Sequence, residues 1–153
     1  MGCDIHAVIE VYHDDRKKWV NVGDPLMYRN YTIFAALGDV RNWDSPIPCI
    51  AKNRLHQDED ENFISGEYDD RGIEYFMMRY TSGEFNSLAK EYASDGHSHS
   101  FATLREIKAY TGFPDDFDCW EYWNDLVTRM EVNASVYGVT NPDHIRLVFF
   151  FDC

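Results

Sequence analysis

The stretch 94–100, Ser-Asp-Gly-His-Ser-His-Ser, places two imidazoles among three hydroxyls, so its residue types could do chemistry. Thr103 and Glu106 follow with the T-x-x-E spacing of a capping box, which predicts a helix N-terminus directly after the stretch. Unpaired N–H groups and the positive end of the helix dipole suit such a position to an anion. Imidazoles and hydroxyls beside it could donate to phosphate oxygens, bind a metal or transfer protons. The candidate ligand-binding residues are therefore His97, Ser98, His99 and Ser100. The open alternative is a polar loop followed by an ordinary helix cap.

The N-terminal segment 4–12 alternates in polarity, which predicts a β-strand. One face carries Ile5, Ala7, Ile9 and Val11, and the other carries Asp4, His6, Val8 and Glu10. Residues two apart on a strand share a face, so Asp4, His6 and Glu10 could point into one site. A solvated face is the alternative, which we favour for Glu10 but not for Asp4 and His6.

Two arginines flank a short predicted helix over 31–37, for which Asn30 is the expected N-cap. Arg29 precedes this helix and Arg41 follows it. In so acidic a chain, each guanidinium is a candidate ligand for an anion. The ordinary outcome for any single arginine is instead a salt bridge to one of the many carboxylates.

Imidazole and carboxylate groups together suit general acid–base catalysis and also bind first-row metals. If the protein is an enzyme or holds a divalent metal, the candidate catalytic residues and metal ligands are Asp4, His6, His97 and His99, with Asp152 as a possible addition. The chain contains no H-E-x-x-H, P-loop or G-x-S-x-G pattern, so whether it is an enzyme stays open.

The charge balance limits the partners. The chain has 14 basic and 27 acidic residues, a net charge of −13. Non-specific binding of DNA or RNA needs a basic face, and so does binding to an anionic membrane surface. We therefore expect neither as a partner. A small anionic ligand in a local basic pocket is compatible with this charge, because a pocket is local and the net charge is global.

The four cysteines are Cys3, Cys49, Cys119 and Cys153. Their wide spacing, without a C-x-x-C pair, predicts neither a zinc finger nor a disulfide framework. The first residues lack a basic region followed by an apolar run, so we expect no signal peptide and no transmembrane helix. These features predict a cytoplasmic protein with reduced thiols.

The hydrophobic pattern predicts a single domain, 1–153, with an α+β fold. We expect a small, mainly antiparallel sheet that includes the N- and C-terminal strands, covered by four or five helices. The further expected strands are 18–22 and the apolar run 145–151, which should pair with 4–12. The further expected helices are 71–80, 84–93, 104–110 and 115–136. The segment 42–72 is irregular, and its acidic run 57–61 reads as a solvated or mobile loop, or a lid.

Four stretches of the chain carry a resemblance. They are MGCDIH at 1–6, the segment from RNY to VRN at 29–42, the segment from DGHSHS to TLRE at 95–106, and RLVFFFD at 146–152. Together they resemble an uncharacterised family of small proteins encoded by bacteriophages and prophages. Members often end in Phe-Asp-Asn, whereas this chain has Cys153 in the last position. The resemblance implies no particular activity, but it implies a setting, the cytoplasm of an infected bacterial host.

In that setting, small proteins without a DNA-binding charge often counter host defence, which we use as an analogy. Our first hypothesis is an anti-defence protein that binds and sequesters a nucleotide-derived immune messenger, such as a cyclic ADP-ribose isomer or a cyclic nucleotide. The segment 97–100 and His6 would hold the phosphate, Arg29 and Arg41 would supply charge, and aromatic residues would clamp the base. The first alternative is a phosphodiesterase-type hydrolase, with or without a metal. The second is an acidic protein–protein inhibitor, and a homo-oligomer is compatible with each.

Overall fold

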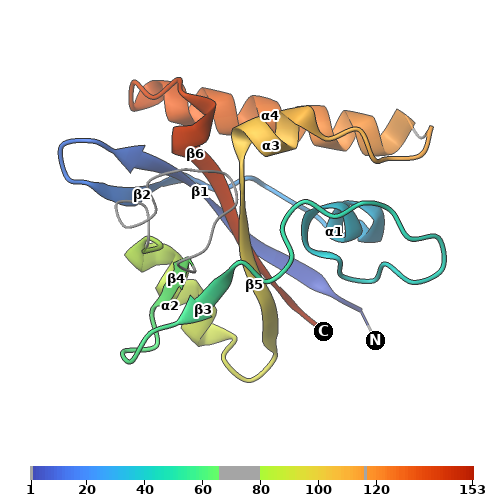
Figure 1. Ribbon diagram of the computed structural model, residues 1–153, viewed down its shortest axis with the longest axis horizontal. Helices are drawn as coiled ribbons and strands as arrows, with labels where there is room; N and C mark the ends of the chain where they lie inside the picture. The colour runs from blue at the N-terminus through green and yellow to red at the C-terminus, as the bar shows by residue number, and fades with distance from the viewer. Residues whose placement is uncertain (1, 66–79, 116) are drawn as a thin grey trace.

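An antiparallel four-stranded sheet, in the order β2-β1-β6-β5, forms the centre of the molecule (Figure 1). The computed structural model describes residues 2–65, 80–115 and 117–153. The strands are β1 (Asp4–His13), β2 (Lys18–Gly23), β3 (Leu55–Gln57), β4 (Phe63–Ser65), β5 (Gly96–Thr103) and β6 (Ile145–Asp152). The helices are α1 (Tyr31–Gly38), α2 (Gly83–Glu91), α3 (Leu104–Ala109) and α4 (Phe117–Val136), with a short 3-10 helix, η2, at Pro142–His144. The predicted α+β class is confirmed.

The strands nearest the two ends of the chain lie side by side. β1 pairs with β6 along its length, from Asp4 opposite Asp152 to Val11 opposite Ile145. Figure 1 shows the N- and C-terminal ends of the described chain close together at one end of the sheet. The predicted pairing of 4–12 with 145–151 is therefore confirmed. Its consequence is that side chains almost the full chain length apart become neighbours.

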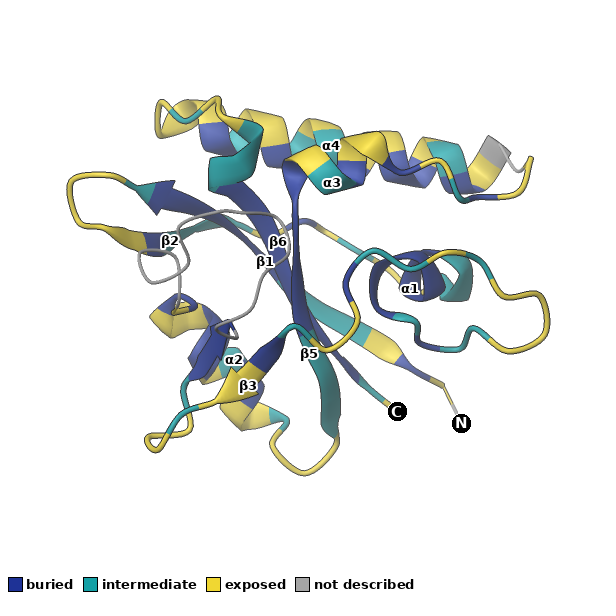
Figure 2. Cartoon of the chain, viewed as in Figure 1, coloured by how far each residue is buried: buried dark blue, intermediate teal, exposed yellow. Residues whose placement is uncertain are grey.

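Both faces of the sheet are covered. Ile9 and Phe149 belong to a core cluster on the face packed by α1, α3 and α4. Val8 and Phe150 belong to a second cluster on the opposite face, where α2 and the β3–β4 sheet lie. Figure 2 shows β6 buried along nearly its whole length, while the outer side of α4 is exposed. The strict alternation of side chains along a strand explains why neighbours enter different clusters.

The stretch 94–100 differs from its prediction. From Gly96 onward it is β5, an edge strand paired with β6, rather than a polar loop. The register shifts between His97 and Ser100, where Ser98 has a φ of 58°. Histidine, serine and glycine are not typical strand residues, so the sequence did not indicate β5, which pairs with a neighbour on one side only. The predicted capping box is confirmed, because Thr103 and Glu106 cap α3 reciprocally.

Glu10 is buried, so the prediction of a solvated position is wrong. Its carboxylate accepts from Arg146 Nε at 2.9 Å and from the Ser82 N–H at 2.7 Å. Glu10 is 0% exposed and Arg146 is 1% exposed. The Arg146 guanidinium also lies over the Trp19 ring, 3.9 Å from its centroid. A buried charge needs such a partner, because an unpaired one loses its hydration without compensation.

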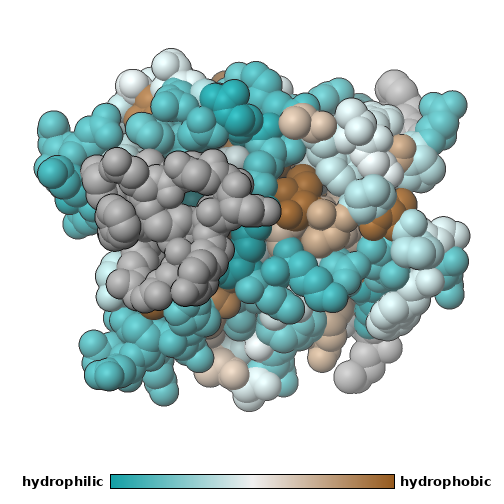
Figure 3. Space-filling model, in the orientation of Figure 1, coloured by the Kyte–Doolittle hydropathy of each residue, from teal (hydrophilic) through white to brown (hydrophobic). Residues whose placement is uncertain are grey.

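The remaining segments follow the predictions in part. Asn30 caps α1 by accepting from two N–H groups, as expected. The segment 42–72 contains the short strands β3 and β4, and the acidic run lies at the turn between them. The helix predicted over 71–80 falls almost entirely outside the described residues. Figure 3 shows a largely hydrophilic face, with hydrophobic side chains emerging between the α3–α4 layer and α1. Within the described ranges, no helix combines the length and apolarity needed to cross a membrane.

The buried ion pair predicts a large loss of stability when only one partner is removed. Arg146→Met should lower the free energy of unfolding by about 3–5 kcal/mol, because it leaves the Glu10 carboxylate buried without its counter-charge. Adding Glu10→Gln should recover part of this loss, since the amide oxygen still accepts from Ser82. Urea unfolding followed by circular dichroism measures both variants.

The matched control is Arg105→Met, which breaks the exposed pair between Arg105 and Asp143. This variant should unfold close to the wild-type urea midpoint. Equal stability of Arg146→Met and the wild type would contradict the structural role of the pair.

Candidate functional site

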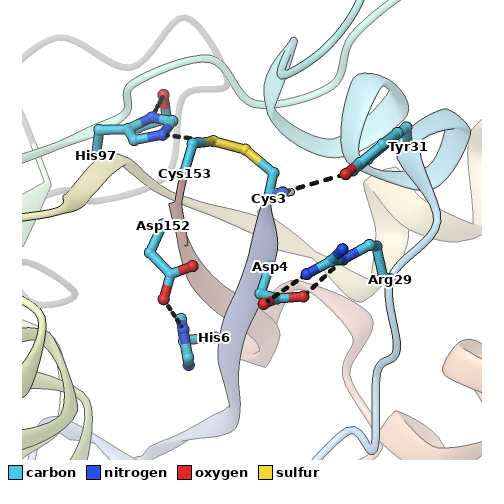
Figure 4. The surroundings of a disulfide bond; sticks show 9 residues. Cys3, Asp4, His6, Arg29, Tyr31, His97, Asp152 and Cys153 are labelled. Atoms are coloured by element: carbon cyan, nitrogen blue, oxygen red, sulfur yellow. Dashed lines mark hydrogen bonds and ion pairs between the residues drawn. A yellow bond between two sulfur atoms is a disulfide. The ribbon is translucent and has the colours of Figure 1, made fainter. Parts of the chain in front are cut away.

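Polar and reactive side chains gather where β1 begins, β5 begins and β6 ends (Figure 4). Four contacts define this sheet-end cluster, and each joins residues from different parts of the chain. The residues are Cys3, Asp4, His6, Arg29, His97, Asp152 and Cys153. The structure thus brings together five of the predicted site residues at one end of the sheet, namely Asp4, His6, Arg29, His97 and Asp152.

Cys3 and Cys153 form a disulfide across the end of the sheet. The prediction of four reduced thiols without a disulfide is therefore wrong. The two cysteines are 150 residues apart in sequence, yet each lies one position beyond the paired Asp4 and Asp152. Their Cα atoms are 4.2 Å apart, a distance set by strand pairing rather than by a local cysteine motif. Cysteine spacing alone could not reveal this.

His97 lies directly against the disulfide. Its Nε2 is 3.1 Å from Cys153 Sγ, and its Nδ1 is 2.9 Å from Ser98 Oγ. Figure 4 shows the imidazole turned toward the sulfur atoms. The positive φ of Ser98 and the shifted register of β5 set the backbone that aims this ring. An imidazole beside sulfur can accept a thiol proton or share a metal with thiolates.

His6 forms a second polar pair with Asp152. Its Nε2 lies 2.7 Å from Asp152 Oδ2, and both side chains are about one-fifth exposed, at 19% and 21%. The imidazole also packs at a tilt against Tyr92 and stacks on Phe150, with ring centroids 4.0 and 5.0 Å away. A carboxylate that orients an imidazole is a common arrangement in general acid–base catalysis. The prediction that His6 and Asp4 share a face of β1 is confirmed, because both lie in the regular pairing of β1 with β6, where residues two apart point to the same side.

Asp4 engages Arg29 through two hydrogen bonds of 2.9 and 3.0 Å. The Arg29 hydrogen bond holds the pKa of the Asp4 carboxyl below its ordinary value. The same contact raises the pKa of Arg29. The alternative considered for each arginine, a salt bridge to a carboxylate, is therefore the observed state of Arg29. Since its charge is already matched, Arg29 offers less to an incoming anion.

The other predicted residues lie elsewhere. His99 stacks between Phe63 and Phe150, with centroids 4.1 and 5.0 Å away. Ser100 is buried and accepts from the Arg54 N–H. Arg41 lies over the rings of Tyr31 and Trp43, beside a cavity of about 240 Å³. In the described part of the chain, no three of the proposed ligands Asp4, His6, His97 and His99 meet as a metal-binding group, whereas His97 groups with the two disulfide cysteines.

The N-terminus of α3, the expected phosphate position, already holds a carboxylate of this chain. Glu106 Oε1 accepts from the Thr103 N–H at 3.1 Å. Arg54 in turn donates to both carboxylate oxygens of Glu106, at 2.8 and 2.7 Å. An anion would have to displace this internal ion pair, so the helix N-terminus is less available than the sequence suggested.

A cavity that the sequence did not reveal lies between the β1–β2 hairpin and the start of α2. Its volume is about 480 Å³, within the range of small-ligand sites. It is lined by His13, Arg16, Lys18, Trp19, Val20, Asn21, Tyr80, Thr81, Ser82, Gly83, Glu84 and Tyr137. Charged, aromatic and hydroxyl groups thus face one space. We call it the hairpin cavity.

Two cations of the hairpin cavity differ from the described basic residues that form ion pairs. Within the described ranges, six Lys and Arg side chains form ion pairs with carboxylates, namely Arg29, Lys52, Arg54, Arg105, Lys108 and Arg146. Among the described residues, neither Arg16 nor Lys18 has such a carboxylate partner. The only sequence signal was a charged turn near 13–17, which is typical of any exposed hairpin.

Comparisons with known proteins do not assign this chain to a family. No protein-family model, no curated protein and no solved structure matches the chain. The function must therefore be argued from the side chains themselves.

The aromatic setting of His99 predicts an acid-sensitive fold. Burial, with a smaller effect of His97, lowers the pKa of His99 to about 4. In the unfolded chain the pKa is about 6.5, so below that pH the unfolded state binds a proton that the folded state does not. Stability should therefore fall as the pH drops from about 6.5 to about 4. His99→Phe keeps the stack and should reduce this loss, as measured by urea unfolding at pH 7 and 4.5.

His56→Phe makes the same substitution at an exposed position of β3 and serves as the control. It should retain the pH dependence of the wild type. An identical pH dependence in His99→Phe and the wild type would show that His99 is not held neutral by its surroundings.

Proposed function

We propose that this protein binds and sequesters a small anionic, nucleotide-derived ligand in the hairpin cavity. The observation that carries the proposal is that Arg16 and Lys18 both line this cavity. Neither forms an ion pair with a carboxylate among the described residues. In a chain of net charge −13, two such cations beside one cavity create a local site for negative charge.

The rest of the lining suits the other parts of a nucleotide. Tyr80 and Tyr137 offer aromatic surface and are more than half exposed, at 51% and 56%, whereas Trp19 lines the cavity but is 4% exposed. Aromatic side chains stack on bases of any type. Asn21 and Thr81 add polar groups that can bind ribose or base edges. The cavity therefore combines charge for phosphate with stacking surface for a base.

The resemblance to phage-encoded proteins narrows the ligand class. We propose an immune messenger, either a cyclic ADP-ribose isomer or a cyclic dinucleotide, which the protein withholds from a bacterial defence system. In this proposal the protein acts in the cytoplasm of the infected host. We now propose Arg16 and Lys18 as the ligand-binding residues in place of Arg29 and the segment 97–100. The reasons are that Arg29 forms an ion pair with Asp4 and that Ser100 is buried.

A hydrolase is the second candidate, and one observation favours it. His6 and Asp152 form a close imidazole–carboxylate pair, and His6 also lines a cavity of about 200 Å³ with Asp24 and Met27. Such a pair could activate water against a phosphodiester. In this alternative, the ligand would be cleaved at the sheet end rather than stored in the hairpin cavity.

Incubation with a panel of cyclic ADP-ribose isomers and cyclic dinucleotides tests the function. After removal of unbound compound and heat denaturation, chromatography of the supernatant should recover one messenger intact. Recovery of cleavage products would instead support the hydrolase, and their loss in Asp152→Asn would locate it. Failure to take up any member of the panel would contradict both.

Charge removal should weaken binding of the messenger recovered in that test. Arg16→Gln and Lys18→Gln should each reduce affinity roughly tenfold or more, because each removes a charge-assisted contact. Isothermal titration calorimetry measures the change. Lys90→Gln, an equal loss of charge on the exposed end of α2, is the matched control and should bind as the wild type does.

Gly83 allows a sharper version of this experiment. A Cβ at Gly83 meets no atom within 4 Å, so a side chain there has room at the cavity. Gly83→Asp adds a negative charge that favours the helix N-terminus but repels an anionic ligand. It should therefore keep or raise the melting temperature while reducing affinity, and Gly83→Ala should leave affinity unchanged. Equal affinity of the Asp and Ala variants would place the ligand elsewhere.

A further inference from the structure

We propose that Cys3, Cys153 and His97 form a binding site for a thiophilic divalent metal ion of the Zn²⁺ class, available only when the disulfide is reduced. One ligand atom from each residue lies within 4.8 Å of the others. No other group of three or more such ligands occurs in the described ranges. This inference does not depend on the proposed function, because it concerns the opposite end of β1.

The spacing of the ligand atoms suits a tetrahedral ion. At a tetrahedral ion, Zn–S bonds of ~2.3 Å and Zn–N bonds of ~2.0–2.1 Å place the two sulfurs and the nitrogen roughly 3.5–3.8 Å apart. His97 Nε2 and Cys153 Sγ are already 3.1 Å apart. The two cysteines lie on paired strands with Cα atoms 4.2 Å apart, so side-chain rotation can separate the sulfurs without moving the sheet.

His97 is oriented as metal-binding histidines usually are. Its Nδ1 is engaged by Ser98 Oγ at 2.9 Å, which leaves Nε2 directed at the sulfur atoms. A hydrogen bond to the second ring nitrogen fixes the tautomer and the orientation of a ligating imidazole. Cys3 is buried, His97 is half-buried and Cys153 is exposed, so an ion can enter from solvent while one ligand is held in the core.

The neighbouring carboxylates are committed to other partners. Asp4 binds Arg29 and Asp152 binds His6, so the group offers three protein ligands. Two thiolates and one neutral imidazole neutralise a divalent ion and leave its fourth position for water or a ligand. Three protein ligands with an open position characterise reactive zinc sites, whereas closed structural sites use four.

The disulfide between Cys3 and Cys153 and the binding of a metal by the same two sulfurs exclude each other. Two molecules of a small monothiol, such as glutathione, reduce the disulfide by exchange and yield two cysteine thiols and one glutathione disulfide. The ion then displaces one proton from each thiol and binds both thiolates and His97 Nε2. Because each sulfur is either in the disulfide or bound to the metal, the redox state of the pair decides whether the ion is held.

Titration of the intact chain with Co²⁺, a spectroscopic probe for Zn²⁺, tests the site. The wild type reduced with a phosphine and freed of metal should bind one equivalent and show a thiolate-to-metal charge-transfer band. The oxidised wild type should show neither, and this comparison needs no variant. Displacement of the band by equimolar Zn²⁺ is also expected. Absence of the band in the reduced protein would overturn the proposal.

Variants assign the ligands, with circular dichroism as the check of folding. Cys153→Ser and His97→Ala should each weaken Co²⁺ binding at least tenfold, and Cys153→Ser should also diminish the charge-transfer band. Cys49→Ser, the same substitution at a cysteine outside the disulfide, should bind as the wild type does. Unchanged affinity in Cys153→Ser or His97→Ala, or loss of binding in Cys49→Ser, would overturn the assigned ligand set.

Discussion

The pairing of β1 with β6 is the constraint on which the rest of the structure depends. Its register places Glu10 opposite Arg146 inside the sheet and Asp4 opposite Asp152 at its end. The same register carries Cys3 to Cys153 one position further on. A shift by a single residue would turn every side chain of one strand to the other face, which would remove Phe150 from its core cluster and separate the buried charges. One pairing therefore determines both the core and the sheet-end cluster.

Charge matching separates the two candidate regions. At the sheet end, Arg29 and His6 each face a carboxylate, so the region has no surplus positive charge for an anion. Its remaining groups are two sulfurs and an imidazole, which suit a metal ion. In the hairpin cavity, Arg16 and Lys18 lie beside aromatic surface, which suits a phosphate attached to a base. Local charge matching, rather than the −13 of the whole chain, therefore distinguishes what each region can hold.

The sequence predicted features that depend on local pattern. Alternation revealed β1, a capping box revealed the start of α3, and an apolar run revealed β6. The errors arose where distant residues determine the environment. Glu10 was predicted to be solvated because its partner, Arg146, is distant in sequence. The disulfide between Cys3 and Cys153 was not predicted because only strand pairing brings these two cysteines together. The hairpin cavity was missed for the same reason, since its walls come from the hairpin, the segment 80–82, the start of α2 and the residue Tyr137.

The distance between the hairpin cavity and the sheet-end cluster bears on whether a ligand in the cavity would be stored or cleaved. His6 and His13 are seven residues apart on β1, or about 23 Å at ~3.3 Å per residue. A ligand held by Arg16 and Lys18 therefore lies beyond direct reach of the His6–Asp152 pair, since proton transfer requires hydrogen-bond contact or a single bridging water. Our two proposals, storage and hydrolysis, therefore concern different places on one sheet. The cavity lining includes His13 and Glu84, but among the described residues these two form no ion pair like that of His6 and Asp152, which supports our proposal of sequestration there.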